Sequence, residues 1–317
     1  MSTPSGSYLK VHYELRPAKQ VERRMLVDAL QELSADGFAI KHYKYTGMGS
    51  VYFIDFMLFH RLLGISDMLS VEIDPRIEKR VEFNKPFKCV DTKIASMGEI
   101  IPTLSQKKKH LLWLDYDSCT DESHLEDVTL AATYLTPGSI LLVTVDIEPP
   151  ETDDDDNSPH AWMRYFRKEA ADYFDASFTP KDFRESILYK RNIEFIEKAI
   201  RAGITGRSGI EFIPMFNFIY KDGHKMLTMG CMIGTSIEKQ QLLGSYLAKA
   251  KYFRKSFELP PCVIQVPRLT RKERQYLDGF MPCKSTWMPT DFELSKDSVK
   301  AYRNIYRFCP TFAELLI

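Results

Sequence analysis

The chain has 317 residues, of which 44% are hydrophobic and 27% charged, a composition typical of a folded globular protein. Lys and Arg together number 43, as do Asp and Glu, so the zero net charge argues against a general electrostatic affinity for nucleic acid. No apolar run approaches the roughly 20 residues of a membrane span, and the first residues lack a signal-peptide core, so we expect a cytoplasmic protein.

The first half of the chain alternates short apolar runs with helical segments. A helix is predicted over residues 16–37, where Pro17 suits the first turn and apolar residues recur at helical spacing. Strands are then predicted over residues 41–45, 67–74, 88–95, 110–117 and 138–149, and helices over residues 51–63, 75–83, 97–104 and 122–135. Asp74 is expected to cap the helix that Pro75 opens. This alternation predicts an α/β fold with a doubly wound, mostly parallel sheet.

The second half has a different pattern. An acidic loop is predicted at residues 153–156, followed by helices over residues 161–174 and 181–203. Asp222-Gly223 joins two extended runs and predicts an antiparallel hairpin within residues 209–234. A long helix is predicted over residues 237–254, and Thr270 with Glu273 forms a capping box for another. We therefore expect a lead-in (1–40), an α/β domain (41–234) with a helical insertion (about 151–205), and a C-terminal α/β extension (235–317) packed on the same domain.

Polar residues and glycines fall where the predicted parallel strands end, which is where ligands bind in such sheets. Gly47 and Gly49 follow strand one, where backbone N–H groups can face a ligand. The alternative is that the two glycines only make a tight turn and bind nothing. Glu72 ends strand two and is placed to hold the two hydroxyls of a ribose. Asp115 directly follows "LLWL", where an unpaired carboxylate is costly, so it is the leading catalytic or substrate-binding candidate.

Other residues near these strand ends have more than one interpretation. Asp91 lies near strand three, and Ser96 and Met97 follow it, where an adenine ring could rest. Asp117 either faces the same crevice as Asp115 or caps the next helix. Asp115, Asp117 and Asp146 offer oxygen ligands that suit a divalent cation, but carboxylates also orient water or cap helices, and no metal ligand is predicted.

The order of these features resembles that of class I S-adenosylmethionine-dependent methyltransferases. More narrowly, the segments "YELRPAKQVERRML", "YTGMGSVYFIDFMLFHRLLGI", "VEFNKPF", "LWLDYD" and "DGHKMLTMG" resemble bacterial proteins labelled putative O-methyltransferases. The resemblance spans roughly residues 12–233 and, more loosely, the tail. Two departures stand out: Tyr45 occupies the place of the usual acid before the first glycine, and the glycine motif is shortened to "GMGS".

The resemblance implies a Rossmann-like sheet, S-adenosylmethionine as the cofactor, and methyl transfer to an oxygen or nitrogen of an acceptor that it does not identify. A small molecule, a nucleotide and a nucleic acid all stay open as acceptors. It makes Gly47 and Gly49 the turn beside the methionine moiety, Glu72 the ribose ligand and Asp115 the residue beside the methyl group. The predicted cofactor contacts are Tyr45, Thr46, Gly47, Met48, Gly49, Glu72, Ile73, Asp91, Ser96, Met97 and Asp115. The predicted catalytic residues are Asp115, Tyr116 and Asp117.

The two departures keep a second hypothesis open. The chain would then be a catalytically silent subunit that keeps the fold and binds a nucleotide or a protein partner, for example in a bacterial phage-defence system. The predicted insertion is rich in basic and aromatic residues that either face a phosphate-bearing substrate or form an ordinary solvated face over a core. Those basic residues are Arg164, Arg167, Lys168, Lys181, Arg184, Lys190 and Arg191.

Overall fold

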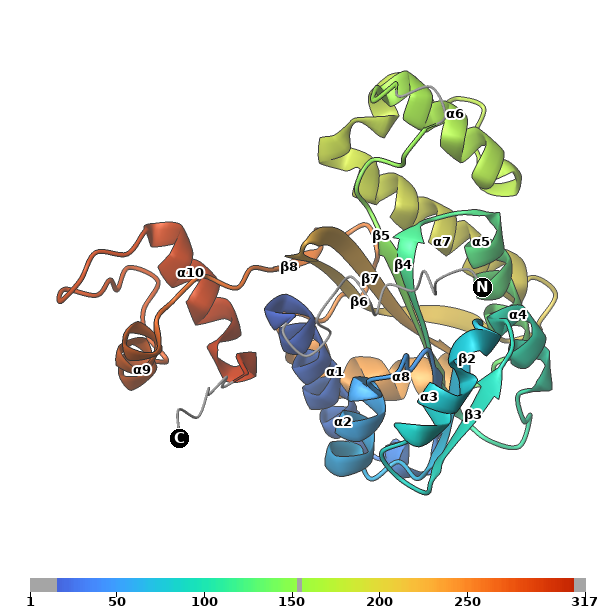
Figure 1. The fold of residues 1–317 in the computed structure, drawn as a ribbon, viewed down its shortest axis with the longest axis horizontal. Helices are drawn as coiled ribbons and strands as arrows, with labels where there is room; N and C mark the ends of the chain where they lie inside the picture. The colour runs from blue at the N-terminus through green and yellow to red at the C-terminus, as the bar shows by residue number, and fades with distance from the viewer. Residues whose placement is uncertain (1–15, 153–155, 311–317) are drawn as a thin grey trace.

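An eight-stranded sheet crosses the protein in the order β3-β2-β1-β4-β5-β7-β6-β8, with helices on both faces (Figure 1). The computed structural model describes residues 16–152 and 156–310. The strands are β1 (Lys44–Gly47), β2 (Asp67–Glu72), β3 (Val90–Ile94), β4 (His110–Cys119), β5 (Ser139–Asp146), β6 (Glu211–Asp222), β7 (His224–Gly234) and β8 (Cys262–Ile264). Strands β1 to β5 are parallel, β7 runs antiparallel to both of its neighbours, and β8 runs parallel to β6. The predicted fold class is confirmed.

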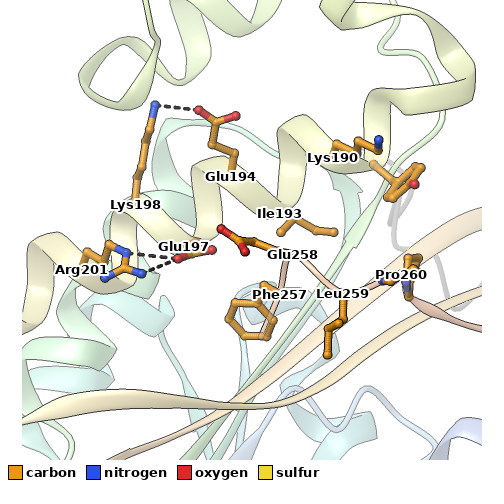
Figure 2. Close-up of a pocket in the computed structure, with 12 residues that line it drawn as sticks. Lys190, Ile193, Glu194, Glu197, Lys198, Arg201, Phe257, Glu258, Leu259 and Pro260 are labelled. Atoms are coloured by element: carbon orange, nitrogen blue, oxygen red, sulfur yellow. Dashed lines mark hydrogen bonds and ion pairs between the residues drawn. The ribbon is translucent and has the colours of Figure 1, made fainter. Parts of the chain in front are cut away.

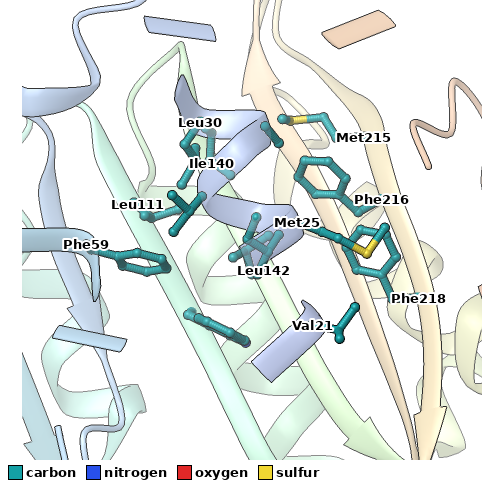
Figure 3. Close-up of a cluster of buried hydrophobic side chains, with 14 of the residues drawn as sticks. Val21, Met25, Leu30, Phe59, Leu111, Ile140, Leu142, Met215, Phe216 and Phe218 are labelled. Carbon is teal, nitrogen blue, oxygen red and sulfur yellow. The ribbon is translucent and has the colours of Figure 1, made fainter. Parts of the chain in front are cut away.

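Helices cover the sheet because its central strands are apolar on both faces. The helices are α1 (Pro17–Ala35), α2 (Ile54–Leu63), α3 (Glu78–Phe83), α4 (Met97–Ile100), α5 (Glu122–Tyr134), α6 (Pro159–Glu169), α7 (Leu188–Ile204), α8 (Ser236–Gly244), α9 (Arg271–Phe280) and α10 (Lys296–Ile305). Along β4, Leu111 belongs to the core under α1 and α2, whereas Leu112 belongs to the core under α5 and α7. Figure 3 shows the first core, in which Met25 of α1 packs between Leu142 and Phe218 of the sheet.

Several predicted boundaries are wrong for local reasons. β1 starts only at Lys44, because residues 40–42 form a short 3-10 turn, and it runs on to include Gly47. The long helix predicted over residues 237–254 ends at Gly244, where Ser245 turns extended and its hydroxyl donates to the carbonyl oxygen of Leu242 (2.6 Å). The second helix of the insertion starts only at Leu188, after two 3-10 turns.

The antiparallel hairpin is confirmed: Gly223 links β6 to β7 with a φ of +99°, a conformation that glycine adopts without strain. The acidic loop predicted at residues 153–156 lies, except for Asp156, outside the described residues. In the described parts of the chain, no helix has both the length and the apolar character that a membrane span requires.

The turn after β1 packs tightly against β2, which explains its second glycine. The N–H of Gly49 donates to Ser70 Oγ (3.2 Å). A Cβ at position 49 would collide with that hydroxyl and would lie 2.8 Å from the ring of Phe56. Close packing, rather than an unusual backbone conformation, therefore requires glycine here.

Replacing Gly49 by alanine tests this packing. Gly49→Ala overpacks the turn and should lower the free energy of unfolding by about 1–3 kcal/mol, measured by urea denaturation. The control is Gly279→Ala, because a Cβ on Gly279 of α9 meets no atom within 4 Å. That variant should be neutral or slightly more stable, and equal losses in the two variants would contradict the packing argument.

Candidate active site

The sheet has a notch at its carboxyl edge, because β1 ends before its two neighbours. Gly47, the last residue of β1, is level with Ser70 of β2 and Trp113 of β4. β2 continues to Glu72, and β4 continues past Asp115 to Cys119. Glu72 and Asp115 each lie two residues beyond the level of Gly47. Two interstrand spacings, roughly 10 Å, separate their backbones across the end of β1.

The backbone of the two residues that follow Glu72 holds its side chain. Its Oε1 accepts hydrogen bonds from the backbone N–H groups of Ile73 (2.9 Å) and Asp74 (3.3 Å). In the described parts of the chain nothing donates to its Oε2. Burial raises the pKa of Glu72; the two N–H groups lower it, and the charges of Asp74 and Asp117 raise it further. Asp117 of β4 is thus close enough to Glu72 of β2 to act on its pKa.

The residues beside Glu72 differ in exposure and role. The side chain of Ile73 is 73% exposed, although it is large and apolar. Asp74 accepts from the N–H of Arg76 (2.9 Å) and caps the following turn, as predicted. The edge therefore presents an apolar surface directly next to a carboxylate oxygen that has no donor from the described chain.

Asp115 is ion-paired with a lysine from the first helix. Lys19 Nζ lies 2.8 Å from Asp115 Oδ1 and 2.9 Å from Glu22 Oε2. It also lies 4.4 Å from the centroid of the Trp113 ring. Burial raises the pKa of Asp115 and is the largest single influence on it. The charge and hydrogen bond of Lys19, together with the charges of Arg23 and Arg16, outweigh burial and leave that pKa below its usual value. Asp115 is thus a carboxylate at neutral pH, and its Oδ2 has no donor among the described residues.

Three buried charges of α1 were missed in the sequence. Lys19 and Glu22 are completely buried, and Arg23 is nearly so. Arg23 pairs with the buried Asp55 of α2. The signal was present: Lys19, Glu22 and Arg23 follow the same helical spacing as the apolar residues of this helix.

The start of α1 is fixed by the hairpin. Both carboxylate oxygens of Asp222, the last residue of β6, accept backbone N–H groups of the first turn of α1, those of Ala18 (3.1 Å) and Lys19 (2.8 Å). A carboxylate at this place satisfies two N–H groups that have no partner within the helix and complements the helix dipole. Asp222 therefore sets where Lys19 enters the site.

The first residues predicted to contact a cofactor lie partly in the core. Tyr45 is buried, with its ring 4.7 Å from that of Phe56 and 4.8 Å from that of Phe59, so it is a core residue. Thr46 is buried under the opposite face of the sheet, and Met48 is partly buried there. Gly47 leaves room for the Tyr45 hydroxyl, which would lie 2.5 Å from a Cβ.

The residues predicted near strand three are not all at the edge. Asp91 is exposed and pairs in register with Leu69, three residues before β3 ends, so it lies away from the carboxyl edge of the sheet. The N–H of Ala95 donates to the carbonyl oxygen of Glu72 (3.0 Å), which places Ser96 beside the end of β2. Ser96 caps α4 together with Glu99, and the Met97 side chain is buried in the core.

The two residues after Asp115 diverge. Tyr116 donates its hydroxyl to Asp127 Oδ2 (2.7 Å), and its ring stacks on His124, so it belongs to the α5 side. Asp117 is exposed and has no partner in the described chain. Asp117 does not cap α5, because Asp121 does so through the N–H of His124 (2.9 Å).

A separate group of potential metal ligands lies at the end of β5. Ligand atoms of Asp146, Glu148 and His224 all lie within 4.8 Å of one another. Glu148 also pairs with Lys221 (2.7 Å). Within the described chain, the carboxylates considered from the sequence, Asp115, Asp117 and Asp146, do not form such a group.

A groove of about 600 Å³ lies elsewhere, between α7 and residues 257–261. Figure 2 shows that ion pairs of α7, such as Arg201 with Glu197, line one side, while Phe257 and Leu259 lie on the other. None of the predicted site residues lines this groove.

Basic residues of the insertion are partly engaged within it. Arg167 lies over the ring of Phe174, and Arg191 lies over the ring of Phe178 while pairing with Glu194. Arg164 and Lys168 of α6 are more than half exposed, and they pair with Asp156 (3.4 Å) and Glu169 (2.8 Å). Figure 1 places α6 beyond the tips of β4 and β5, on the carboxyl side of the sheet.

Comparison with known proteins gives one family. The family described as "Putative O-methyltransferase" matches residues 11–317. No curated protein matches the chain. Similar solved structures include Trm1 from Pyrococcus horikoshii with S-adenosyl-L-methionine (TM-score 0.44, 10% identity, 70% of this chain and 57% of that one). A putative O-methyltransferase from Klebsiella pneumoniae has a TM-score of 0.38, with 10% identity over 72% of this chain and 94% of that one. This chain thus covers little more than half of Trm1.

The anchoring of α1 by Asp222 predicts a loss of stability on mutation. Asp222→Ala should lower the free energy of unfolding by about 1 kcal/mol, because two N–H groups of the first turn lose their acceptor. Asp222→Asn is the matched control and should lose less, since an amide oxygen still caps. Urea denaturation measures both, and an alanine variant as stable as the wild type would show that the cap contributes nothing.

Proposed function

The chain belongs to the putative O-methyltransferase family, and on that premise we propose that it transfers the methyl group of S-adenosylmethionine to an oxygen or nitrogen of an acceptor. One observation carries the proposal. Glu72 and Asp115 flank the end of β1, each with one carboxylate oxygen held by the protein and the other without a donor from the described chain. Such half-satisfied carboxylates are prepared to accept hydrogen bonds from a ligand.

The residues around the notch suit the parts of this cofactor. Glu72 Oε2 would accept from the ribose hydroxyls, and the exposed Ile73 offers an apolar surface for the adenine ring. When bound, S-adenosylmethionine supplies a methyl group on a positively charged sulfur. The negative charge of Asp117, which is exposed and has no partner in the described chain, lies on the β4 side and favours a cation there.

Asp115 would orient the acceptor. Because its pKa lies below the usual carboxyl value, it is a weak base, so its Oδ2 acts by accepting a hydrogen bond from an N–H or O–H group. Such a bond fixes the direction of attack, which is a large part of catalysis in a displacement reaction. We propose a nucleotide or nucleic acid as the acceptor, supported by Arg164 and Lys168, which are more than half exposed beyond the same edge although each pairs with a carboxylate of the insertion.

A catalytically silent module remains the second candidate. Two observations favour it: Tyr45, in the place of the usual acid, is buried in the core, and Asp115 is already paired with Lys19. In this case the notch would bind a nucleotide without turnover, which separates the two candidates by experiment.

Binding of the cofactor should depend on Glu72. We expect Glu72→Gln to weaken S-adenosylmethionine binding roughly 10- to 100-fold in calorimetry, because a hydrogen bond to a charged group is lost. Asp91→Asn is the control and should bind as the wild type does, since Asp91 lies below the edge. Equal affinity of wild type and Glu72→Gln would contradict the ribose assignment.

The same carboxylate predicts a pH dependence. The ionised form of Glu72 accepts the hydroxyl groups, so affinity should fall as pH falls through the pKa of the free protein, which burial raises above 4.5. Glu72→Gln should lack this fall. Calorimetry across the acidic range measures it, and an identical pH dependence in both proteins would refute the assignment.

Turnover should depend on Asp115. Wild-type protein is incubated with methyl-labelled S-adenosylmethionine and the RNA, DNA and small-molecule fractions of a bacterial lysate. Asp115→Asn should bind the cofactor within a few-fold of wild type, but transfer should fall roughly 100-fold or more. Cofactor binding by the wild type without label in any fraction would favour the silent module.

A further inference from the structure

We propose that Lys19 of α1 is a positioning residue of the methyl-transfer site: it holds Asp115 Oδ1 and so leaves Oδ2 in one fixed orientation toward the acceptor. The inference rests on the proposed function. It assigns part of the site to the first helix, which precedes the whole parallel sheet in the chain.

The position of the lysine is tightly determined. Its side chain has no exposure, and its ammonium group is held between Asp115 Oδ1 (2.8 Å), Glu22 Oε2 (2.9 Å) and the face of Trp113 (4.4 Å to the centroid). The backbone N–H of the same residue is fixed by Asp222 (2.8 Å). A buried ammonium cannot leave such partners for water at low cost, so the ion pair is permanent in the folded protein.

Glu22 is the obvious alternative partner, since it lies one turn away on the same helix. A buried cation that only needed neutralising would be satisfied by Glu22 alone. Burial raises the pKa of Glu22, whereas Lys19 holds that of Asp115 down. Asp115 also acts more strongly than Glu22 on the pKa of Lys19, so Asp115 is the main partner of the ammonium group.

The charged surroundings of the ammonium come from three elements. They are Glu22 and Arg23 of α1, Asp115 of β4 and Tyr220 of β6, with Arg16 also acting on Asp115. Without the Lys19 cation, burial still raises the pKa of Asp115, but the largest influence that lowers this pKa is gone. The pKa of Asp115 should then rise, and the carboxylate should become free to rotate.

Arg23 provides a matched control on the same helix. It is buried like Lys19 and pairs with Asp55 of α2 in place of Asp115. If buried charges of α1 serve only to dock the helix, removing either cation should have the same effect on the site. If Lys19 positions Asp115, its removal should change the reaction far more than removal of Arg23, which acts on Asp115 only through its charge.

The test compares Lys19→Met with Arg23→Met by calorimetry with S-adenosylmethionine and by methyl transfer to the fraction that wild type labels. Lys19→Met should bind the cofactor within a few-fold of wild type, lose roughly 10- to 100-fold in transfer rate, and show an acidic limb of the pH–rate profile moved to higher pH. Arg23 lowers the pKa of Asp115 less than Lys19 does, so Arg23→Met should move the acidic limb less and keep a rate within a few-fold of wild type in its folded fraction. Lys19→Arg keeps a cation in altered geometry, so its acidic limb should stay in place while its rate falls.

Three results for Lys19→Met would overturn the proposal. They are a transfer rate equal to that of Arg23→Met, a transfer rate above that of wild type, and a loss of cofactor binding that accompanies the loss of rate. If Lys19→Met does not fold, Lys19→Arg decides, and an unchanged rate rejects the positioning role. A wild-type protein that binds no S-adenosylmethionine would instead overturn the proposed function itself, so the two failures are distinct.

Discussion

A buried ammonium must have anionic partners, and this requirement ties the first helix of the chain to the edge of the sheet where the site lies. Lys19 reaches Asp115 on β4, Arg23 reaches Asp55 on α2, and Asp222 of the hairpin receives the first turn of α1. Buried ion pairs add little net stability, but breaking one leaves an unpaired charge at a cost of about 3–5 kcal/mol. The pairs therefore specify where α1 docks, and through it where the Asp115 carboxylate is held.

The sheet could be predicted because its information is local. Apolar runs alternating with amphipathic segments show a parallel α/β sheet, and Asp222-Gly223 shows the hairpin, without knowledge of distant contacts. Boundaries were less predictable where competing local bonds decide them. The Ser245 hydroxyl ends α8 early, although the apolar spacing continues beyond it. Similarly, β1 is displaced by a 3-10 turn that the apolar pattern does not indicate.

The site was predictable only where a residue's place follows from the end of a strand. Gly47, Glu72 and Asp115 share one edge because the carboxyl ends of parallel strands lie on the same side of a sheet, whereas the place of Asp91 depends on the register of β3, which no local pattern reveals. Tyr45 was assigned by its position next to the glycines, but strand alternation turns it into the core. Lys19 was missed because its partner Asp115 is 96 positions away in the chain. A charged residue within the apolar stripe of a helix is the sequence signal for a buried ion pair with a distant partner.

The arrangement of the edge has one central consequence: an adenosine-containing ligand should lie over the end of β1, between an acid that holds the ribose and an acid that faces the acceptor. A crystal structure with S-adenosylhomocysteine tests this most directly. We expect the ribose hydroxyls on Glu72, the adenine ring against Ile73, and the sulfur on the Asp115 side. Ligand density in the groove between α7 and residues 257–261, with the end of β1 vacant, would contradict it.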